Sequence, residues 1–371
     1  MFFTIDKDSL LNKLKIVEKV TAQRGNVQPV LANVLFEAEN NVLNLSATDL
    51  EISVKAKTTV AVKKEGKITL PAKKLLEIAA KLPDKPVEFS LNEDTNVVSI
   101  NCGSSKFEII GISAQEFPKT EDEIKGGTEI EIEIEPFLKS IKNTVYAAAN
   151  YENRNVISGV FCLIKDNKLE MAATDGNRLT RIIEAIKNKE AKNAKIVIPS
   201  KTLNEFVRIC SFVAEEKVIL IIDKSRLTLK TANFSINSRL IEGEYPPYEQ
   251  LIPKSTTNNA VISRDELISA LDRVSTMVND RTSFVKFLFD SNKLVLSAET
   301  PNSGNSEDII ECKYQGDELA IAFNYKYVLD SIKTMEAKAV KIGLNGSLSA
   351  TVFKPDSDEN YICLIMPIQI R

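Results

Sequence analysis

The sequence predicts an α+β protein made of three tandem copies of one domain, and two recurring markers predict it. Leu-Ser-Ala-Thr-Asp at residues 45–49 recurs as Met-Ala-Ala-Thr-Asp at 171–175 and more loosely as Leu-Ser-Ala-Glu-Thr at 296–300, at spacings of 126 (171 − 45) and 125 (296 − 171) residues. A second marker begins at residues 68, 196 and 321, at spacings of 128 (196 − 68) and 125 (321 − 196). Solenoid repeats run to about 20–50 residues. A longer period, close to the usual domain size, indicates three separate cores.

The order of expected elements is the same in each copy. A short strand comes first, and an amphipathic helix follows it, near residues 10–20, 137–149 and 265–278. The strands expected next lie at 30–37, 156–164 and 284–289, and a hairpin then carries the first marker. A second helix follows the second marker, at 72–81, 201–210 and 325–335. Further strands close each domain, which gives two helices and roughly eight strands per copy.

Local signals support these elements and their boundaries. Ser263 followed by Glu266 is a capping box for the third domain's first helix. Residues 129–134 alternate glutamate with isoleucine, which is typical of a strand with one wet face, and Pro136 suits the first turn of the next helix. Turn-rich stretches at 126–127 and 253–259 predict the linkers. We therefore expect domains at residues 1–122, 128–253 and 255–371.

Composition excludes several classes of protein. The 371 residues contain no histidine, which removes Ser-His-Asp and Cys-His catalysis and nearly all zinc sites. No phosphate-cradling glycine motif occurs. No apolar run approaches the length of a membrane span, and the N-terminus does not read as a signal peptide. The five cysteines are widely spaced, so we expect free thiols in a reducing cytoplasm.

The positions of the basic residues lead to a different conclusion from the net charge. A net charge of −3 taken alone argues against nucleic-acid binding. Each second helix, however, carries two basic residues seven positions apart, about two helical turns, so both project from one face. The pairs are Lys74 with Lys81, Lys201 with Arg208, and Lys326 with Lys333. Either these are ordinary solvated faces, or they form a shared basic surface that follows phosphates without reading bases.

Several longer runs resemble one family, the bacterial DNA sliding clamp, which is the beta subunit of DNA polymerase III. Thr-Asp-Gly-Asn-Arg-Leu at residues 174–179 is similar to its Thr-Asp-Gly-His-Arg-Leu signature. The runs at 238–248 and 323–330 and the Met-Pro at 366–367 resemble it too. The resemblance covers essentially the whole chain, with the three copies in register.

The resemblance implies a head-to-tail homodimer that closes six domains into a ring around double-stranded DNA, without sequence specificity. Contacts that close head to tail give rings rather than filaments. Such a ring does no chemistry. It slides and tethers the replicative polymerase as a processivity factor. The implied protein is cytoplasmic and bacterial, with no cofactor, no metal and no membrane partner.

The resemblance also implies residues that contact DNA. They follow each first helix or open each second one: Arg24, Lys73, Asn150, Tyr151, Arg154 and Lys201. Ser200 departs from the family pattern, in which a second basic residue is common at that position.

The family's partner site lies between the middle and last domains. There the polymerase III catalytic subunit, the clamp loader, other polymerases and mismatch-repair proteins insert short apolar peptides. The matching positions are Ile157, Thr174, Gly176, Asn177, Arg178, Leu179, Pro246, Leu251, Leu348, Ile365, Met366 and Pro367. Apolar side chains beside a few polar groups and a flexible methionine suit such a site. Asn177 and Gln250 depart from the usual histidine and arginine, so the preferred peptide is expected to differ.

Other interpretations remain at this stage. Asp175-Gly176 is also a ready hairpin turn, and Leu179, Leu348 and Ile365 also suit a core. A magnesium-dependent phosphoryl-transfer enzyme could use Asp49 and Asp175. Because these aspartates are equivalents in separate copies, a repeated structural turn explains them better. A surface adhesin of repeated domains would need a signal peptide.

Overall fold

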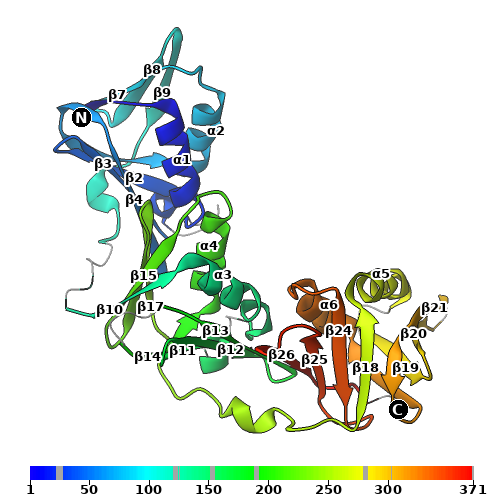
Figure 1. The fold of residues 1–371 in the computed structure, drawn as a ribbon. Coiled ribbons are helices and arrows are strands. Elements are labelled where there is room, and N and C mark those ends of the chain that lie inside the picture. The colour runs from blue at the N-terminus through cyan, green and yellow to red at the C-terminus, as the bar shows by residue number, and fades with distance from the viewer. Residues whose placement is uncertain are drawn as a thin grey trace. The chain divides into compact units, whose positions relative to one another are not determined.

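The computed structural model describes residues 1–21, 28–119, 124, 126–150, 155–187, 192–278, 283–301 and 303–369. Within these residues the chain forms α-helices and antiparallel β-sheets, and the same order of elements occurs three times (Figure 1). None of the described helices has the length and apolar character needed to cross a bilayer.

The first repeat contains α1 and α2 and the strands β1 to β9. Their bounds are β1 Phe2–Ile5, α1 Lys7–Glu18, β2 Asn33–Glu39, β3 Val42–Thr48, β4 Ile52–Thr59, β5 Ala61–Lys64, β6 Gly66–Pro71, α2 Ala72–Lys81, β7 Val87–Asn92, β8 Val97–Cys102 and β9 Ser105–Ile110.

The second repeat contains α3 and α4 and the strands β10 to β17. Their bounds are β10 Thr128–Glu133, α3 Ile134–Lys142, β11 Gly159–Lys165, β12 Lys168–Thr174, β13 Arg178–Ala185, β14 Ala194–Pro199, α4 Ser200–Cys210, β15 Lys217–Ile222, β16 Arg226–Lys230 and β17 Phe234–Arg239.

The third repeat contains α5 and α6 and the strands β18 to β26. Their bounds are β18 Asn258–Ser263, α5 Arg264–Val274, β19 Phe284–Asp290, β20 Lys293–Thr300, β21 Gly304–Glu311, β22 Lys313–Gln315, β23 Leu319–Asn324, α6 Tyr325–Lys333, β24 Ala339–Leu344, β25 Thr351–Pro355 and β26 Tyr361–Ile365.

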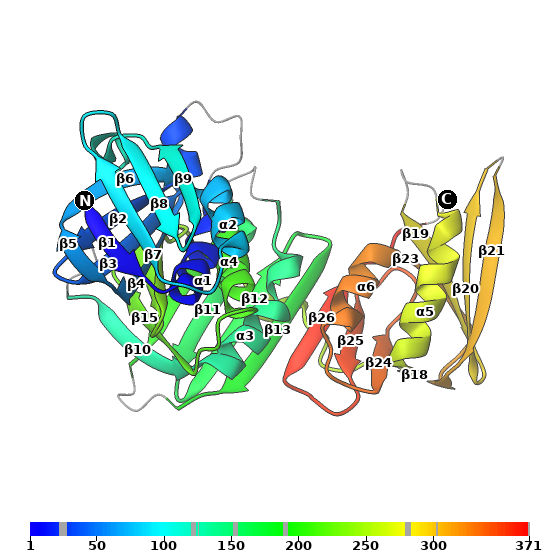
Figure 2. The same ribbon diagram turned by 90° about the horizontal axis from the view of Figure 1, so that it is seen from above.

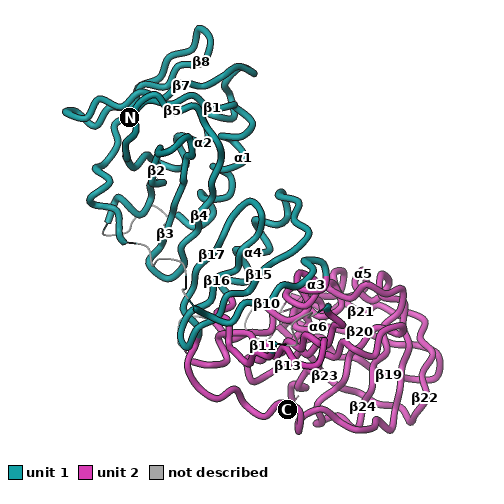
Figure 3. The backbone as a smooth tube through the Cα atoms, turned by 60° about the vertical axis from the view of Figure 1, so that its left-hand side comes forward, with its two compact units in different colours: residues 1–135, 187–192, 201–240 teal, residues 136–186, 193–200, 241–371 magenta. Residues whose placement is uncertain are grey.

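The chain divides into two compact units that do not coincide with the repeats (Figure 3). Unit 1 comprises residues 1–135, 187–192 and 201–240, and unit 2 comprises 136–186, 193–200 and 241–371. Unit 1 holds a five-stranded sheet, β5-β1-β7-β8-β9, and an eight-stranded sheet, β10-β15-β16-β17-β4-β3-β2-β6. Unit 2 holds a nine-stranded sheet, β14-β11-β12-β13-β26-β25-β24-β18-β22, and a four-stranded sheet, β21-β20-β19-β23.

Each large sheet is two smaller ones joined edge to edge. In unit 1, β17 of the second repeat pairs with β4 of the first, with Ser238 opposite Ile52. In unit 2, β26 of the third repeat pairs with β13 of the second, with Ile365 opposite Arg178. The two junctions use equivalent strands in equivalent registers. The second repeat therefore contributes half of its strands to each unit.

Helices cover the sheets within each unit. Helix α1 contacts α2, β3 and β4, and its Leu10, Leu14 and Val17 are fully buried. Helix α5 contacts α6 and strands β20 and β21 (Figure 2). Stacked rings strengthen the first core, where the Phe3 and Phe89 centroids lie 4.9 Å apart. The apolar spacing read from the sequence thus marks the faces that the helices bury.

Most expected elements are confirmed, but several helix ends were wrong. Helix α5, for example, ends at Val274 rather than near 278, and a 3-10 turn at Ser275–Met277 follows it. Helix α1 begins at Lys7 rather than near residue 10, because the Asp6 carboxylate caps it by accepting from the Ser9 amide at 3.0 Å. Helix α3 ends at Lys142 rather than near 149. Just beyond that end, the Thr144 hydroxyl donates to the Ser140 carbonyl at 2.7 Å, and a 3-10 turn at Val145–Ala147 follows.

The local signals behave as expected. The Ser263 hydroxyl accepts from the Glu266 amide at the start of α5, and Pro136 lies in the first turn of α3. In β10 the isoleucines Ile130 and Ile132 are buried and the alternating glutamates are exposed. All five cysteines are free thiols.

Candidate functional site

The turn between β12 and β13 is held by its own side chains. The Thr174 hydroxyl donates to the Arg178 carbonyl at 2.6 Å and accepts from the Gly176 amide at 3.1 Å. One carboxylate oxygen of Asp175 accepts from the Asn177 and Arg178 amides at 2.9 and 3.0 Å. Gly176 has φ +89°, in the left-handed region that glycine adopts without strain. The hairpin turn expected from the sequence is therefore present, and it fixes this loop rigidly.

Strand pairing brings this turn to the end of the chain. Leu179 lies opposite Leu364 and Arg178 opposite Ile365, and the Met366 amide donates to the Asn177 carbonyl at 2.9 Å. The Tyr245 hydroxyl accepts from the Thr174 amide at 3.1 Å, which ties in the segment that continues to Pro246. Residues far apart in sequence thus meet in unit 2, as the resemblance to the clamp family implied for the partner site.

The apolar residues of the expected site divide into a buried layer and an exposed one. Leu179 is 3% exposed and Ile365 is 0% exposed, so both belong to the core, as one of the alternatives held. Leu179 packs in a cluster with Phe161, Tyr248 and Leu364.

The exposed layer has three large apolar side chains. Leu251 is 61% exposed, Leu348 is 64% exposed and Met366 is 46% exposed. Leu348 is therefore not a core residue. Pro246 is exposed, and Ile157 and Pro367 are partly buried. These exposed side chains are the ones that a ligand can contact.

Arg178 has a role that the sequence did not indicate. Its guanidinium forms ion pairs with Asp175 at 3.0 Å and with Asp330 at 2.7 Å, and its side chain is only 10% exposed. It also donates to the Tyr146 carbonyl at 2.5 Å and lies 4.4 Å from the centre of the Tyr327 ring. Burial disfavours the charged form, but Asp330 and Asp175 outweigh burial and raise the pKa of Arg178. Arg178 therefore holds the turn of the second repeat against α6 of the third.

Burial keeps the neighbouring tyrosines protonated. Desolvation raises the pKa values of Tyr245 and Tyr248 well above their usual range. The Tyr248 hydroxyl donates to Glu170 at 2.8 Å, and the hydroxyls of Tyr146 and Tyr361 lie 2.6 Å apart. Tyr245 and Tyr248 belong to the buried cluster that contains Leu179, and none of these tyrosines titrates near neutral pH.

Sequence reasoning missed Tyr245, Asp330, Tyr146 and Tyr327 as parts of this site. Tyr245, Tyr327 and Asp330 lie inside two of the runs that resemble the clamp family, at residues 238–248 and 323–330. Their membership in those runs was the available signal. No local pattern marks Tyr146, since its contact with Arg178 depends on the fold.

The expected DNA-contacting residues differ in their surroundings. Arg24, Tyr151 and Arg154 lie outside the described residues. Lys73 and Asn150 are exposed. Lys201 forms ion pairs with Asp49 at 2.6 Å and with Glu51 at 2.7 Å. Burial disfavours the Lys201 charge, but the hydrogen bonds that Lys201 donates to these carboxylates outweigh burial and raise the pKa of Lys201.

Three more of the paired helix cations have acidic neighbours. Lys74 pairs with Glu77 at 3.0 Å and Arg208 with Glu205 at 2.7 Å, both one helical turn along. Lys333 lies 3.8 Å from Asp272. The basic helix faces are therefore partly neutralised by their own helices and neighbours, which weakens any one contact with phosphate.

The two marker aspartates serve as turn caps. One oxygen of Asp49 accepts from the Glu51 and Ile52 amides at 3.0 and 2.9 Å, as Asp175 does in the next copy. Across the part of the chain that the structure describes, no three His, Cys, Asp or Glu side chains gather as metal ligands. A repeated structural turn accounts for both residues.

Comparison with known proteins follows the three repeats. Residues 1–121 match the family of the DNA polymerase III beta subunit N-terminal domain. Residues 131–247 match the family of its central domain, and residues 249–369 match that of its C-terminal domain. The chain is 28% identical to the "Beta sliding clamp" of Synechococcus elongatus, over 98% of each chain. It is 27% identical to that of Vibrio cholerae, over 100% of each.

Solved structures give the same result. The crystal structure of DNA polymerase III beta subunit from Thermotoga maritima matches with a TM-score of 0.91 at 29% identity, covering 100% of both chains. The DNA polymerase sliding clamp from Bacillus subtilis matches with a TM-score of 0.91 at 26% identity, again over 100% of both.

Replacing Arg178 with methionine tests whether this residue holds the turn at 174–178 against α6. We expect Arg178→Met to lower the free energy of unfolding by about 2–4 kcal/mol, because it leaves the Asp175 carboxylate poorly solvated and without its partner. The shift of the urea midpoint measures this. Lys74→Met is the control, since both side chains of the Lys74–Glu77 pair are mostly solvent-exposed and the pair should contribute far less. Equal shifts in the two variants would contradict the role.

Proposed function

The chain belongs to the DNA polymerase III beta subunit family, and from this premise we propose that it is a replication sliding clamp. It encircles duplex DNA without sequence specificity, slides along it and tethers the replicative polymerase as a processivity factor. The observation that carries this is the match of all three family domains in order, over residues 1–121, 131–247 and 249–369. Tethering raises the polymerase concentration at the primer end without any chemistry in this chain.

A head-to-tail homodimer closes the ring, and the repeat pattern supports this. Strands β4, β13 and β21 begin at residues 52, 178 and 304, and hold the same place in their sheets. Strands β9, β17 and β26 likewise end equivalent sheets. Strand β17 pairs with β4, and β26 pairs with β13. The corresponding strands left at open sheet edges are β9 and β21. An open edge is a template for another strand, so β9 of one chain pairs with β21 of the other.

The edge strands carry features that suit such a contact. Ile110 at the end of β9 is 75% exposed, and Ile309 on β21 is 58% exposed. Carrying over the register of the two existing junctions places Ile109 opposite Gly304 and Lys106 opposite Glu307. Both charged residues are exposed, and opposite charges across a strand pair stabilise it.

DNA is held by position rather than by strong contacts. Lys73 and Asn150, with Arg24, Tyr151, Arg154 and Lys201, contact the phosphate backbone, which carries no sequence information directly. Acidic neighbours weaken the contacts of some helix cations, such as Lys201 beside Asp49 and Glu51. Weak and interchangeable phosphate contacts allow sliding.

Partner proteins dock in unit 2. The polymerase III catalytic subunit, the clamp loader, other polymerases and mismatch-repair proteins place a short apolar peptide on Leu251, Leu348 and Met366, above the core that contains Leu179 and Ile365. The rigid turn at 174–178 forms one side, and Arg178 positions it. Asn177 and Gln250, both exposed, adjust which peptide is preferred.

The protein is a non-catalytic subunit of a DNA-directed polymerase holoenzyme, and its proposed location is the bacterial cytoplasm. Its proposed domains are residues 1–122, 128–253 and 255–371.

Topological holding is tested with the clamp loaded by its loader on nicked circular DNA. We expect retention on the circle in high salt and loss after the circle is cut, because a ring slides off an end. Gel filtration of the DNA-bound fraction measures this. Equal retention on circular and linear DNA would contradict encirclement and indicate ordinary contact binding.

The dimer register is tested by a charge exchange. Lys106→Glu and Glu307→Lys should each raise the dimer dissociation constant about tenfold, since like charges then face each other at two interfaces per ring. Combining both variants in one chain should restore it to near the parent value. Sedimentation equilibrium measures the constant. A double variant as weak as the two single effects added together would reject this register.

The docking site is tested by Met366→Ala. This change should weaken binding of the purified polymerase catalytic subunit about tenfold, because an exposed apolar contact is lost. Surface plasmon resonance measures the affinity. Phe212→Ala, which removes a side chain of similar exposure in unit 1, is the control and should have no effect. The same loss in both variants would mean that Met366 has no particular role.

Salt dependence distinguishes the two described helix lysines. Lys73→Ala should reduce the slope of log affinity against log salt by about 0.9 for duplex DNA, the loss of one phosphate contact. Lys201→Ala should reduce it less, since Asp49 and Glu51 already pair with its ammonium group. Fluorescence anisotropy at several salt concentrations gives the slopes. A larger change for Lys201 would show that DNA displaces those carboxylates.

A further inference from the structure

The turn of the partner site has a close copy in unit 1. The Thr48 hydroxyl donates to the Ile52 carbonyl at 2.9 Å and accepts from the Leu50 amide at 3.0 Å. Asp49 accepts from the next two amides, as Asp175 does. These four hydrogen bonds repeat those of residues 174–178. The first repeat therefore presents the same rigid loop to the strand β17 that the second presents to β26.

One residue of this copy is strained. Leu50 has φ +76° at the position where the second repeat has Gly176 with φ +89°. A bulky side chain rarely adopts this conformation, so stability alone would favour glycine here. Leu50 is also 60% exposed, so burial does not compensate for the strain. A strained, exposed apolar residue on a rigid loop points to a ligand contact.

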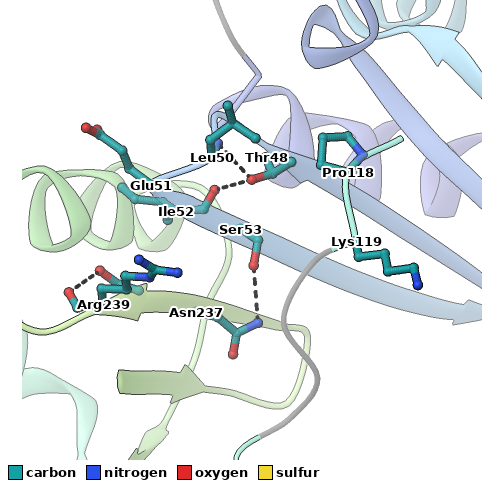
Figure 4. A pocket seen from close by; sticks show the side chains of 10 residues that line it. Thr48, Leu50, Glu51, Ile52, Ser53, Pro118, Lys119, Asn237 and Arg239 are labelled. Atoms are coloured by element: carbon teal, nitrogen blue, oxygen red, sulfur yellow. Dashed lines mark hydrogen bonds between the residues drawn. The ribbon is translucent and has the colours of Figure 1, made fainter. Parts of the chain in front are cut away.

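A cavity of about 140 Å³ lies beside this loop (Figure 4). Its lining comes from the turn, from β17 and from residues 118–119. Ser238 of β17 pairs with Ile52 as Ile365 pairs with Arg178, so the cavity occupies the position equivalent to the partner site. Pockets that enclose small molecules usually measure about 300–1,000 Å³. This cavity suits one or two side chains of an extended segment.

The lining differs in chemistry from the partner site. Asn237, Ser238 and Arg239 stand where the other copy has Leu364, Ile365 and Met366, by the pairing of each strand with its turn. The exposed cations Lys119 and Arg239 line the cavity, as does the half-exposed Glu51. Lys201 pairs with Glu51 and with the neighbouring Asp49, which offsets their negative charge. The cavity therefore favours an anionic group next to an apolar one.

We propose that this cavity is a second docking site, which binds an extended acidic segment of a partner protein. One apolar side chain of the segment lies against Leu50 and Pro118, and a carboxylate lies near Lys119 and Arg239. A nucleic acid fits less well, because the exposed apolar side chain of Leu50 offers nothing to phosphate. Docking proteins at both the apolar and the polar copy would let one chain hold two unlike partners at once.

The probe is an array of immobilised hexapeptides built only from Asp, Glu, Leu and Phe, which includes spots of Leu and Phe alone. A charge-reversed array uses Lys and Arg in place of Asp and Glu, and a labelled duplex DNA is tested in parallel. The full-length protein is compared with a Lys119→Gln/Arg239→Gln double variant, with Leu50→Gly and with Met366→Ala. Thermal melting of each variant checks folding.

Acidic mixed spots should bind the parent protein and lose at least about fivefold in the Lys119→Gln/Arg239→Gln variant and in Leu50→Gly, with weaker binding as salt rises. Leu50→Gly should melt no lower than the parent, which separates a ligand contact from a structural role. Met366→Ala should affect only the Leu and Phe spots. The charge-reversed array should bind no more in the parent than in the double variant.

The proposal would be overturned if binding to the acidic spots were unchanged in the Lys119→Gln/Arg239→Gln and Leu50→Gly variants. The clamp function would stand in that case, provided that binding to the apolar spots still depended on Met366. Loss of duplex DNA binding in the double variant, without loss of peptide binding, would assign the cavity to nucleic acid instead. Failure of both kinds of spot would count against the partner site as well.

Discussion

An open sheet edge is the constraint on which this structure depends. Each repeat ends one of its sheets in a strand whose backbone groups need partners, and an unpaired edge invites uncontrolled association. The chain satisfies β4 with β17 and β13 with β26, in equivalent registers. Both junctions join different repeats, which makes a continuous eight-stranded and a continuous nine-stranded sheet. The two edge strands equivalent to these that stay unpaired within the chain are β9 and β21, and a second copy of the chain can pair with them.

The same kind of junction provides both of the binding sites that we propose. Where a strand from the next repeat meets the marker turn, a threonine and an aspartate lock the loop, and the neighbouring strand end supplies a rim. In unit 2 this rim is apolar, with Met366 exposed and Ile365 buried. In unit 1 the equivalent rim is Ser238 and Arg239, beside a small cavity. One repeated scaffold thus carries two different surfaces, because the loop geometry is fixed by backbone contacts and not by the rim residues.

The sequence predicted the repeat order and helix α2 at 72–81, because recurring markers and apolar spacing report burial directly. The start of α1 was predicted wrongly, because the Asp6 cap sets where this helix begins. The sequence also left open whether Leu179, Ile365 and Leu348 belong to the core. Apolar residues look alike in sequence. Leu179 and Ile365 lie in the paired strands β13 and β26 and are buried, whereas Leu348 lies between β24 and β25 and is exposed. The ion pair between Arg178 and Asp330 joins residues 152 positions apart in the sequence, so no local pattern indicates it.

The most direct measurement of the account traps the edge pairing chemically. Cysteines placed at Lys106 and Glu307 in one chain should form disulfides between two copies under mild oxidation, because directly opposed residues lie within disulfide reach. The protein should then run as a covalent dimer on a non-reducing gel. Cysteines at Ser105 and Glu307 should not cross-link, since a shift of one residue turns the side chains to opposite faces. Cross-linking by the shifted pair, or by neither pair, would contradict closure of the ring by β9 and β21 in this register.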